Sequence, residues 1–306
     1  MFKWRKLLKY FLDADYRFIT NSRRGGYKNW DDETFIKRSY KARMKKVLNL
    51  ENPQTFNEKL QWLKLYDRKP IYTTMVDKSE VKAYVAERIG EEYIIPTLGV
   101  WDSFDEIDFD ALPKRFVLKC THDSGGLVIC KDKARLDLGA ARKKIEKSLK
   151  RDFFAFGREW PYKDVKPRII AEQFMEDPVT QELRDYKFFC FDGEVKALFV
   201  ATERQKPGEE VKFDFFDPDY NHLDFRQGHK NAQTSPEKPL QFELMKELAA
   251  KLSAGVPHVR VDFYEVAGKV YFGELTFFHF GGWVPFEPEE WDFAFGSWIR
   301  LPEKTR

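Results

Sequence analysis

Residues 258–282, HVRVDFYEVAGKVYFGELTFFHFGG, are the part of this sequence that decides the fold. Two apolar runs, His258 to Tyr264 and Lys269 to Leu275, flank an Ala-Gly pair that is typical of a hairpin turn. Asp262 lies in the first run and Glu274 in the second, each among apolar neighbours. Two carboxylates on neighbouring buried strands repel each other unless a cation lies between them. Because Mg²⁺ binds one or two carboxylates together with substrate phosphates, the pattern predicts a magnesium site. The alternative is that one or both carboxylates face solvent.

The rest of the chain alternates helical and extended patterns. Apolar residues at helical spacing predict helices over residues 31–50, 56–65, 78–89, 136–150 and 236–252. Short apolar runs predict strands over residues 116–118, 127–129, 168–174, 185–191, 195–202 and 213–216, and a short extended piece over 93–96. Asp192-Gly193 supplies a hairpin turn between two of these strands. The predicted fold class is α+β.

Length and composition indicate a folded protein with a large core. The 306 residues are 42% hydrophobic, 34% charged and 16% aromatic, which is typical of a globular chain. The three cysteines form no C-x-x-C pair, so neither a disulfide framework nor a zinc cage is expected, and a reducing compartment fits best. The sequence has no run of about eighteen apolar residues and no signal-peptide pattern, so we expect a cytoplasmic protein.

The net charge of +3 is unevenly distributed, since basic clusters lie in the first fifty residues. A helix at the start has apolar side chains on one face and basic ones mostly on the other: Phe2, Trp4, Leu7, Leu8, Phe11 and Leu12 against Lys3, Arg5, Lys6 and Lys9. Such a helix packs on the protein body or contacts the inner face of a membrane, and both interpretations stay open. Residues 1–75 as a whole are interpreted as a basic helical region. Its charged and aromatic side chains would suit an anionic glycan or simply form a solvated surface: Trp4, Arg23, Arg24, Tyr27, Trp30 and Trp62.

A loop with two glycines follows the strand predicted at 116–118. Lys119 is followed closely by Thr121-His122-Asp123-Ser124-Gly125-Gly126. A lysine ammonium can contact phosphate charge, and small residues let backbone N–H groups approach phosphate oxygens. A plain hairpin turn with a surface lysine has the same composition. The common nucleotide signatures are missing, since the sequence has no G-x-x-x-x-G-K-[ST] loop, no G-x-G-x-x-G after a strand and no H-R-D with D-F-G pair.

Taken together, these segments resemble the ATP-grasp enzymes, and among them the TupA-like group associated with teichuronopeptide and other surface polysaccharide synthesis. The resemblance covers nearly the whole chain and rests on six stretches: 52–62 (NPQTFNEKLQW), Asp77-Lys78, 116–126, 170–175, 185–193 and 259–282. It implies an ATP-grasp fold, in which two α+β lobes enclose ATP, preceded here by the basic helical region. A linker helix and the small lobe with its glycine lid loop are expected at 76–168. The large lobe, with the adenine hinge and the magnesium site, is expected at 169–306.

The resemblance also implies which residues bind ATP. Two lysines are expected to contact the phosphates and three lid residues to cover them: Lys78 and Lys119, then Ser124, Gly125 and Gly126. A strand and hinge are expected to line the adenine: Glu172, Gln173, Phe174 and Met175. Asp185 resembles the acidic residue that reaches the ribose, and Lys187 matches a lysine that faces the phosphates or the acceptor.

The metal ligands and one catalytic arginine follow from the same resemblance. Asp262 and Glu274 match the magnesium ligands, and Arg260 matches an arginine that stabilises a transferred phosphoryl group or tetrahedral intermediate. The usual third ligand is an asparagine two residues after the glutamate. Thr276 stands at that place and has no side-chain carbonyl oxygen, so altered metal geometry or a water ligand is expected.

The reaction implied by the resemblance is ATP- and Mg²⁺-dependent ligation of the EC 6.3 type. A carboxylate attacks the γ-phosphate of ATP to give an acyl phosphate, and an amine then displaces phosphate to form an amide. The carboxylate would belong to a uronic acid or glutamyl unit of a surface polysaccharide, glycan-lipid or precursor. The amine would be a small molecule such as an amino acid or amino sugar. No nucleic acid partner is expected.

Other functions remain open. A sugar kinase would use the same ATP site, and a glycosyltransferase of capsule, O-antigen or teichuronopeptide synthesis would use an Asp-x-Asp motif, which occurs at 13–15, 108–110 and 217–219. A catalytically silent membrane-surface or glycan-binding module would fit the basic N-terminus and Thr276. His279 either orients an acceptor or acts as a base, or it is a residue of an aromatic pocket.

Overall fold

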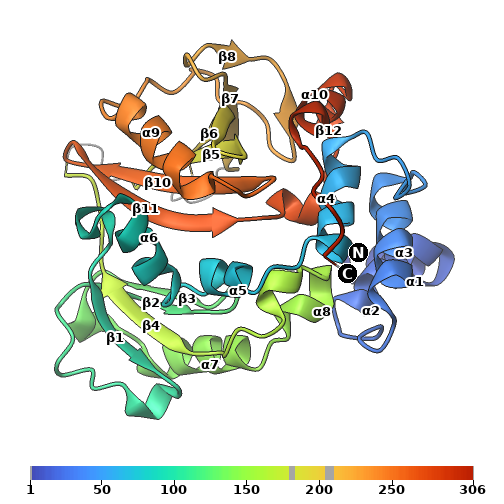
Figure 1. The fold of residues 1–306 in the computed structure, drawn as a ribbon. Helices are drawn as coiled ribbons and strands as arrows, with labels where there is room; N and C mark the ends of the chain where they lie inside the picture. The colour runs from blue at the N-terminus through green and yellow to red at the C-terminus, as the bar shows by residue number, and fades with distance from the viewer. Residues whose placement is uncertain (1, 179–182, 204–209, 306) are drawn as a thin grey trace.

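Two antiparallel sheets form the body of the chain (Figure 1). The computed structural model describes residues 2–178, 183–203 and 210–305. The four-stranded sheet has the order β1-β4-β2-β3 and consists of β1 (Thr97–Trp101), β2 (Phe116–Cys120), β3 (Leu127–Cys130) and β4 (Ile169–Gln173). The six-stranded sheet has the order β11-β10-β5-β6-β7-β8 and consists of β5 (Asp185–Phe191), β6 (Glu194–Thr202), β7 (Lys212–Phe216), β8 (His222–Leu223), β10 (Val259–Val266) and β11 (Lys269–Thr276). A small pair joins β9 (Arg226–Gln227) to β12 (Phe286–Glu287).

Helices connect the sheets and cover them. The α-helices are α1 (Phe2–Leu12), α2 (Ala14–Ser22), α3 (Asp32–Met44), α4 (Phe56–Tyr66), α5 (Ile71–Val76), α6 (Val81–Ile89), α7 (Leu138–Leu149), α8 (Phe153–Gly157), α9 (Phe242–Ser253) and α10 (Glu290–Trp298). The 3₁₀ helices are η1 (Glu91–Tyr93), η2 (Phe104–Glu106), η3 (Lys133–Arg135), η4 (Trp160–Tyr162) and η5 (His279–Gly282). Within the described ranges, no helix has the length and apolarity needed to cross a membrane.

The α+β class is confirmed, and the shifted helix ends have local causes. The helix expected over 31–50 ends at Met44, because Lys45 takes a left-handed φ of 60°. The helix expected over 78–89 begins at Val81, because the Asp77 carboxylate accepts two N–H groups of the preceding turn.

One extended segment is shifted along the chain. Of the extended piece expected at 93–96, Tyr93 ends η1 and Ile94 is extended, and the strand β1 begins at Thr97. This strand contains Gly99, where a Cβ would lie 2.3 Å from the Trp101 ring, so glycine is needed for the close packing of that ring. A glycine inside a short run weakens the sequence signal for a strand.

The apolar core is divided in two. The smaller core lies between the four-stranded sheet, η2 and α7, whereas the larger one runs from the front helices through the six-stranded sheet to α10. β4 pairs with β1 and β2, so the small lobe extends to Gln173, beyond the division expected between residues 168 and 169. Val85 of α6 belongs to the larger core, although α6 precedes the small lobe in the chain.

The front helices are attached to the large lobe and do not form a separate unit. α4 packs on α10, and Asn57 of α4 donates a hydrogen bond to Asp292 at 2.9 Å. Trp62, expected on a glycan-binding surface, is buried in the larger core instead. Tyr27 of the same expected surface is half-buried and stacks on Phe18, with 4.7 Å between ring centroids.

Candidate active site

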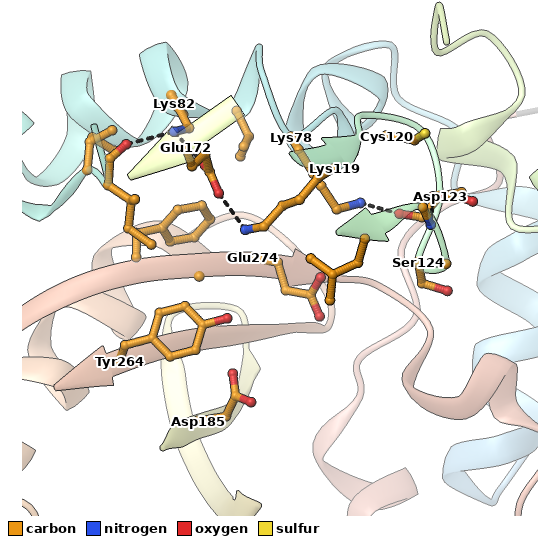
Figure 2. A pocket seen from close by; sticks show the side chains of 18 of the residues that line it. Lys78, Lys82, Lys119, Cys120, Asp123, Ser124, Glu172, Asp185, Tyr264 and Glu274 are labelled. Carbon is orange, nitrogen blue, oxygen red and sulfur yellow. Dashed lines mark hydrogen bonds and ion pairs between the residues drawn. The ribbon is translucent and has the colours of Figure 1, made fainter. Parts of the chain in front are cut away.

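A cavity of about 260 Å³ lies between the two lobes (Figure 2). Its lining includes residues expected to bind nucleotide from both lobes: Lys78, Lys119, Ser124, Gly125, Gly126, Glu172, Asp185, Lys187 and Glu274. A second cavity of about 260 Å³ adjoins it and shares Lys119, Glu172 and Tyr264 in its lining. The two cavities together form one elongated site.

Acidic and carbonyl groups balance three lysines in the first cavity. Glu172 on β4 lies between Lys82, at 2.6 Å, and Lys119 (Figure 2). Burial acts to raise the pKa of Glu172, but the two lysines hold it below its usual value. Lys78 donates a hydrogen bond to the backbone carbonyl of Asp123. A phosphate entering this cavity would therefore meet ammonium groups that are already positioned.

The lid loop is a built turn that depends on one glycine. Asp123 accepts the N–H of Gly126 at 3.0 Å and the hydroxyl of Ser148. A Cβ at Gly126 would lie 2.5 Å from the Cys120 sulfur and 2.6 Å from the Ser148 hydroxyl, so no larger residue fits without a shift. Lys119 is half-buried beside this turn. The loop is therefore not a plain surface hairpin.

The second cavity has the character expected of an adenine site. Gln173, Phe174 and Met175 line it together with apolar side chains of the small lobe such as Val117 and Ile129. The guanidinium of Arg115 lies 4.0 Å from the centroid of the Phe174 ring and fixes that ring by a cation–π contact. Apolar walls and a strand backbone suit a planar base.

The residues expected to hold magnesium converge on Arg260. Asp262 and Glu274 are paired directly across β10 and β11. Arg260 Nε and Nη2 each donate to Asp262 at 2.7 Å, and Nη2 also lies 3.1 Å from Glu274 Oε1 and 3.0 Å from Thr276 Oγ1. The cation that separates the two carboxylates is therefore a guanidinium within the protein.

Lys187 and His279 complete this cluster. Lys187 donates to Asp262 and lies 3.3 Å from Asp185. Burial acts to raise the pKa of Asp262, but Arg260 and Lys187 hold it below its usual value. Burial and the charge of Arg260 lower the pKa of His279 well below its usual value, so the neutral ring accepts from Arg260 at Nδ1, 2.7 Å away. His279 packs among rings as well, so the aromatic-pocket interpretation and contact with Arg260 hold together.

The donor set fits Mg²⁺ that is shared with phosphates and does not fit a cage made of protein alone. No three histidine, cysteine, aspartate or glutamate side chains are grouped to hold a metal in the part of the chain that the structure describes. Glu274 and Thr276 offer oxygen, and Glu274 keeps 44% of its side chain exposed at the cavity. Both oxygens of the buried Asp262 accept from Arg260 or Lys187, so this carboxylate would have to exchange one of those bonds to reach a metal. Mg²⁺ commonly takes one or two carboxylates and completes its shell with phosphates and water.

A family model described as TupA-like ATPgrasp matches residues 58–300. The chain belongs to this family. It has the ATP-grasp fold, with the two cavities between its lobes and the front helices added to the large lobe. No curated protein matches the chain significantly.

Solved structures similar to this TupA-like ATP-grasp chain are distant. An L-amino acid ligase from Bacillus licheniformis is 16% identical over 72% of this chain and 48% of its own, with a TM-score of 0.44. A D-alanine-D-alanine ligase from Helicobacter pylori is 17% identical over 81% and 69%, with a TM-score of 0.39. The ATP-grasp ligase PsnB, complexed with a minimal precursor, Mg and ADP, is 12% identical over 72% and 57%, with a TM-score of 0.39. The chain thus spans about half the length of the first of these proteins.

Sequence reasoning missed several residues that line the first cavity, among them the polar side chains of Lys82, Asp123 and Tyr264. Lys82 follows Lys78 by four residues, which is the spacing of neighbours on a helix face. Tyr264 follows Asp262 by two residues on one strand, so the alternation of the strand places both on the same face. Both signals could have been read from the sequence.

The Asp-x-Asp motifs have structural roles in this TupA-like chain. The first aspartate of each accepts N–H groups of the turn or helix that follows: Asp13 from residues 15 and 16, Asp108 from 110 and 111, and Asp217 from 219 and 221. An aspartate used in this way stabilises a turn. These motifs give no support to a glycosyltransferase.

Proposed function

We propose that the chain is an ATP- and Mg²⁺-dependent ligase that joins a carboxylate to an amine through an acyl phosphate. One observation carries this proposal. Lys78, Lys119, the lid loop and Glu274 line a single cavity in a chain of the ATP-grasp family, with Arg260 directly behind it. Cations, backbone donors and a metal-binding carboxylate are the groups that phosphoryl transfer requires.

The chain's own residues hold the nucleotide and stabilise charge. Lys78 and Lys119 exchange their protein acceptors for phosphate oxygens, and the N–H groups of the lid loop close over them. The base lies in the adjoining cavity beside Phe174 and Met175. Because these groups are already positioned, little reorganisation is needed when charge develops.

Asp262 and Glu274 would hold Mg²⁺, with Thr276 as the third oxygen donor. When bound, the ion supplies neutralisation of phosphate charge. Arg260 keeps the two carboxylates at a fixed separation and faces the charge that forms as the substrate carboxylate oxygen attacks the γ-phosphorus. Lys187 neutralises Asp262 and lies 3.3 Å from Asp185, so it is placed to shift toward phosphate or acceptor.

We further propose that the carboxylate is a uronic acid or glutamyl unit of a surface polysaccharide, a glycan-lipid or their precursor, and that the amine is an amino acid or amino sugar. The family resemblance and the basic front region support this choice. Arg23, Arg24 and Trp30 are exposed there and could contact an anionic glycan.

Thermal unfolding with ATP and Mg²⁺ tests the nucleotide site. A ligand at 100 times its Kd stabilises the folded state by about 2.7 kcal/mol, so the Tm of the wild type should rise. The rise should require Mg²⁺ and vanish in Glu274→Ala. The control Glu87→Ala removes a carboxylate that is 83% exposed and should keep the full rise. A rise with a nucleotide sugar and none with ATP would contradict the proposal.

Product analysis separates the ligase from a kinase. The ligase releases ADP and free phosphate only when both a carboxylate and an amine are present. ADP release with phosphate transferred to a sugar hydroxyl would identify a sugar kinase instead.

The N-terminal helix supports a proposal about location. On α1 the side chains of Trp4, Leu7, Leu8, Phe11 and Leu12 are all at least 50% exposed. Lys6 and Lys9 on the same helix are exposed as well. Apolar side chains flanked by lysine suit an anionic phospholipid surface, so we propose that α1 binds the inner face of the membrane.

Sedimentation with vesicles tests this location. Phosphatidylglycerol-containing vesicles should carry the wild type down, and pure phosphatidylcholine vesicles should not. A Leu8→Gln/Leu12→Gln variant should stay in solution. Leu240→Gln changes a leucine that is 85% exposed elsewhere and should sediment normally. Equal sedimentation of both variants would contradict the proposal.

A further inference from the structure

Two arginines lie between the lid loop and the front helices. α2, α4 and α8 are on the same side of the molecule (Figure 1). Arg151 comes shortly before α8, and a Cβ at Gly125 of the lid loop would lie 3.2 Å from Arg151 Nη1. Gly125 lines the first cavity. The Arg151 guanidinium therefore lies against the loop that forms one wall of that cavity.

The Phe156 ring connects Arg151 to the second arginine, Arg43 on α3. The guanidinium carbon of each arginine lies 5.7 Å from the centroid of this ring. The two guanidiniums are therefore no farther apart than the sum of these distances. Arg43 also lies 5.8 Å from the ring centroid of Trp283, in the segment that follows η5. One molecule with two anionic groups can thus contact both arginines.

Neither guanidinium has an anionic partner among the residues that the structure describes. Arg43 is half-buried, and its Nε is buried without a hydrogen-bond partner. Burial and the charge of Arg23 lower the pKa of Arg43 to about 10, so this side chain is charged at pH 7. A partly buried charge without a counter-charge is unfavourable, and the nearby rings compensate for it only in part. Other arginines of low exposure do pair with an aspartate: Arg68, Arg158 and Arg260.

Contacts to the backbone fix the segments that carry the arginines and the ring. Lys64 on α4 donates to the carbonyl of Gly157 on α8 at 3.0 Å and to that of Gly281 in η5 at 2.7 Å. Arg158, almost fully buried at the end of α8, donates to three backbone carbonyls of residues 27–30. α8 is thus held both to η5 and to the loop after α2. A ligand that binds there meets side chains on a framework that is already ordered.

We propose that Arg43 and Arg151 bind a second anionic group of the acceptor, a carboxylate on a unit next to the one that reacts. The inference rests on the ligase function proposed above and adds a substrate class to it, namely oligomers of a uronic acid or of glutamate. A guanidinium holds a carboxylate through two N–H donors, so the arginines select acceptors by charge and by orientation. They are specificity-determining residues and take no part in the chemical step.

Calorimetric titration of short oligomers and their monomers measures this selection without turnover. Trigalacturonate is compared with D-galacturonate, and γ-linked tri-L-glutamate with L-glutamate, each with ADP and Mg²⁺ present. Fully methyl-esterified trigalacturonate has the same sugar units without their charge. The variants are Arg43→Gln, Arg43→Lys and Arg151→Gln. The control Arg135→Gln changes an exposed arginine that lines neither cavity. Thermal shifts with ATP and Mg²⁺ check that each variant folds and binds nucleotide.

The wild type should bind one of the trimers about 10-fold or more tightly than its monomer, which is the effect of one added hydrogen-bonded charge pair. Arg43→Gln and Arg151→Gln should each bring the two Kd values together, and Arg135→Gln should leave them apart. Arg43→Lys should recover only part of the difference, because lysine keeps the charge and lacks the planar pair of donors. The methyl ester should bind no more tightly than D-galacturonate.

Three results would overturn the assignment. One is a wild type that prefers neither trimer, and another is a preference that persists in both glutamine variants. The third is loss of the ATP- and Mg²⁺-dependent rise in Tm in Arg151→Gln, which would place that guanidinium at the nucleotide phosphates. Failure of the ligase function looks different. A trimer preference that depends on both arginines, without ADP release from any pair of carboxylate and amine, would mean that the chain binds oligoanions and does not ligate them.

Discussion

Two buried clusters of charge, one around Arg260 and one around Lys64, are balanced in different ways. Asp262 accepts two hydrogen bonds from Arg260, both at 2.7 Å, and a third from Lys187. Lys64, by contrast, donates to backbone carbonyls and is only electrostatically coupled to Glu159. The pKa of Asp262 is held below its usual value, whereas burial raises the pKa of Glu159 to about 7.

The difference teaches what each cluster can do. A buried carboxylate with a full set of charged donors stays ionised and keeps its position, which suits a residue that holds metal and phosphate. A buried carboxylate without such donors changes its protonation state easily, which suits a residue that moves a proton. The Arg260 cluster is therefore named the fixed end, and the Lys64–Glu159 cluster the titrating end.

Among the substitutions considered, removal of the Arg260 guanidinium should lower the free energy of unfolding most. Arg260→Met leaves Asp262 and Glu274 facing each other, so we expect the free energy of unfolding to fall by about 3–5 kcal/mol in urea titrations. Lys187→Met is the matched control, because Asp262 then keeps both bonds to Arg260. Equal decreases in the free energy of unfolding for Arg260→Met and Lys187→Met would contradict the separate role of Arg260 between the two carboxylates.

Glu172 is a second buried carboxylate with charged donors, so it tests whether such donors keep a carboxylate ionised. Glu172→Gln should lower the free energy of unfolding at pH 7 by about 1–3 kcal/mol, since Lys82 and Lys119 lose their partner. The pKa of Glu172 is lowered in the folded state, so its stabilisation is present above its unfolded pKa and is lost as pH falls below it. The difference between wild type and variant should therefore shrink on acidification. A difference that stays constant down to low pH would contradict this.

The titrating end should show the opposite dependence on pH. Burial raises the pKa of Glu159 from 4.5 to about 7, so its contribution to stability falls as pH rises from 4.5 to 7. Burial lowers the pKa of Lys64 from 10.5 to about 7, with Glu159 and Arg43 as the charges that also act on it, so its contribution rises from pH 7 to 10.5. Each slope can reach about 1.4 kcal/mol per pH unit for one proton.

Urea unfolding at pH 5, 7 and 9 measures this pair. Relative to a Lys64→Met/Glu159→Gln variant, the wild type should be least stable at pH 7 and gain on both sides. The double variant also loses the backbone hydrogen bonds of Lys64. This loss changes the stability difference equally at the three pH values, so the minimum at pH 7 stays in place. A monotonic difference would show that the pair does not titrate as proposed.

The sequence could predict that Asp262 and Glu274 lie side by side at the fixed end. It could not predict that Lys64 and Glu159 come together at the titrating end. Asp262 and Glu274 flank one short hairpin, so their pairing follows from local alternation along two neighbouring strands. Lys64 and Glu159 lie on segments far apart in the chain, and they approach each other because both lie against the backbone of Gly281. No local pattern reports such a meeting. Nor did the sequence show that Arg260 would fill the space between the carboxylates, because a bound metal would satisfy the same pattern.

Substitutions of Thr276 should change the free energy of unfolding least, and they show whether its hydroxyl contacts Mg²⁺. Its hydroxyl accepts from Arg260 at 3.0 Å, so Thr276→Val, which keeps the shape of the side chain, should lower the free energy of unfolding by about 1 kcal/mol. If the hydroxyl also contacts Mg²⁺, Thr276→Val should raise the Mg²⁺ concentration needed for the nucleotide-dependent rise in Tm. Thr276→Asn, which supplies a carbonyl oxygen, should lower that concentration. An unchanged Mg²⁺ requirement in both variants would mean that Thr276 acts only as a partner of Arg260, and that two carboxylates and water suffice at the fixed end.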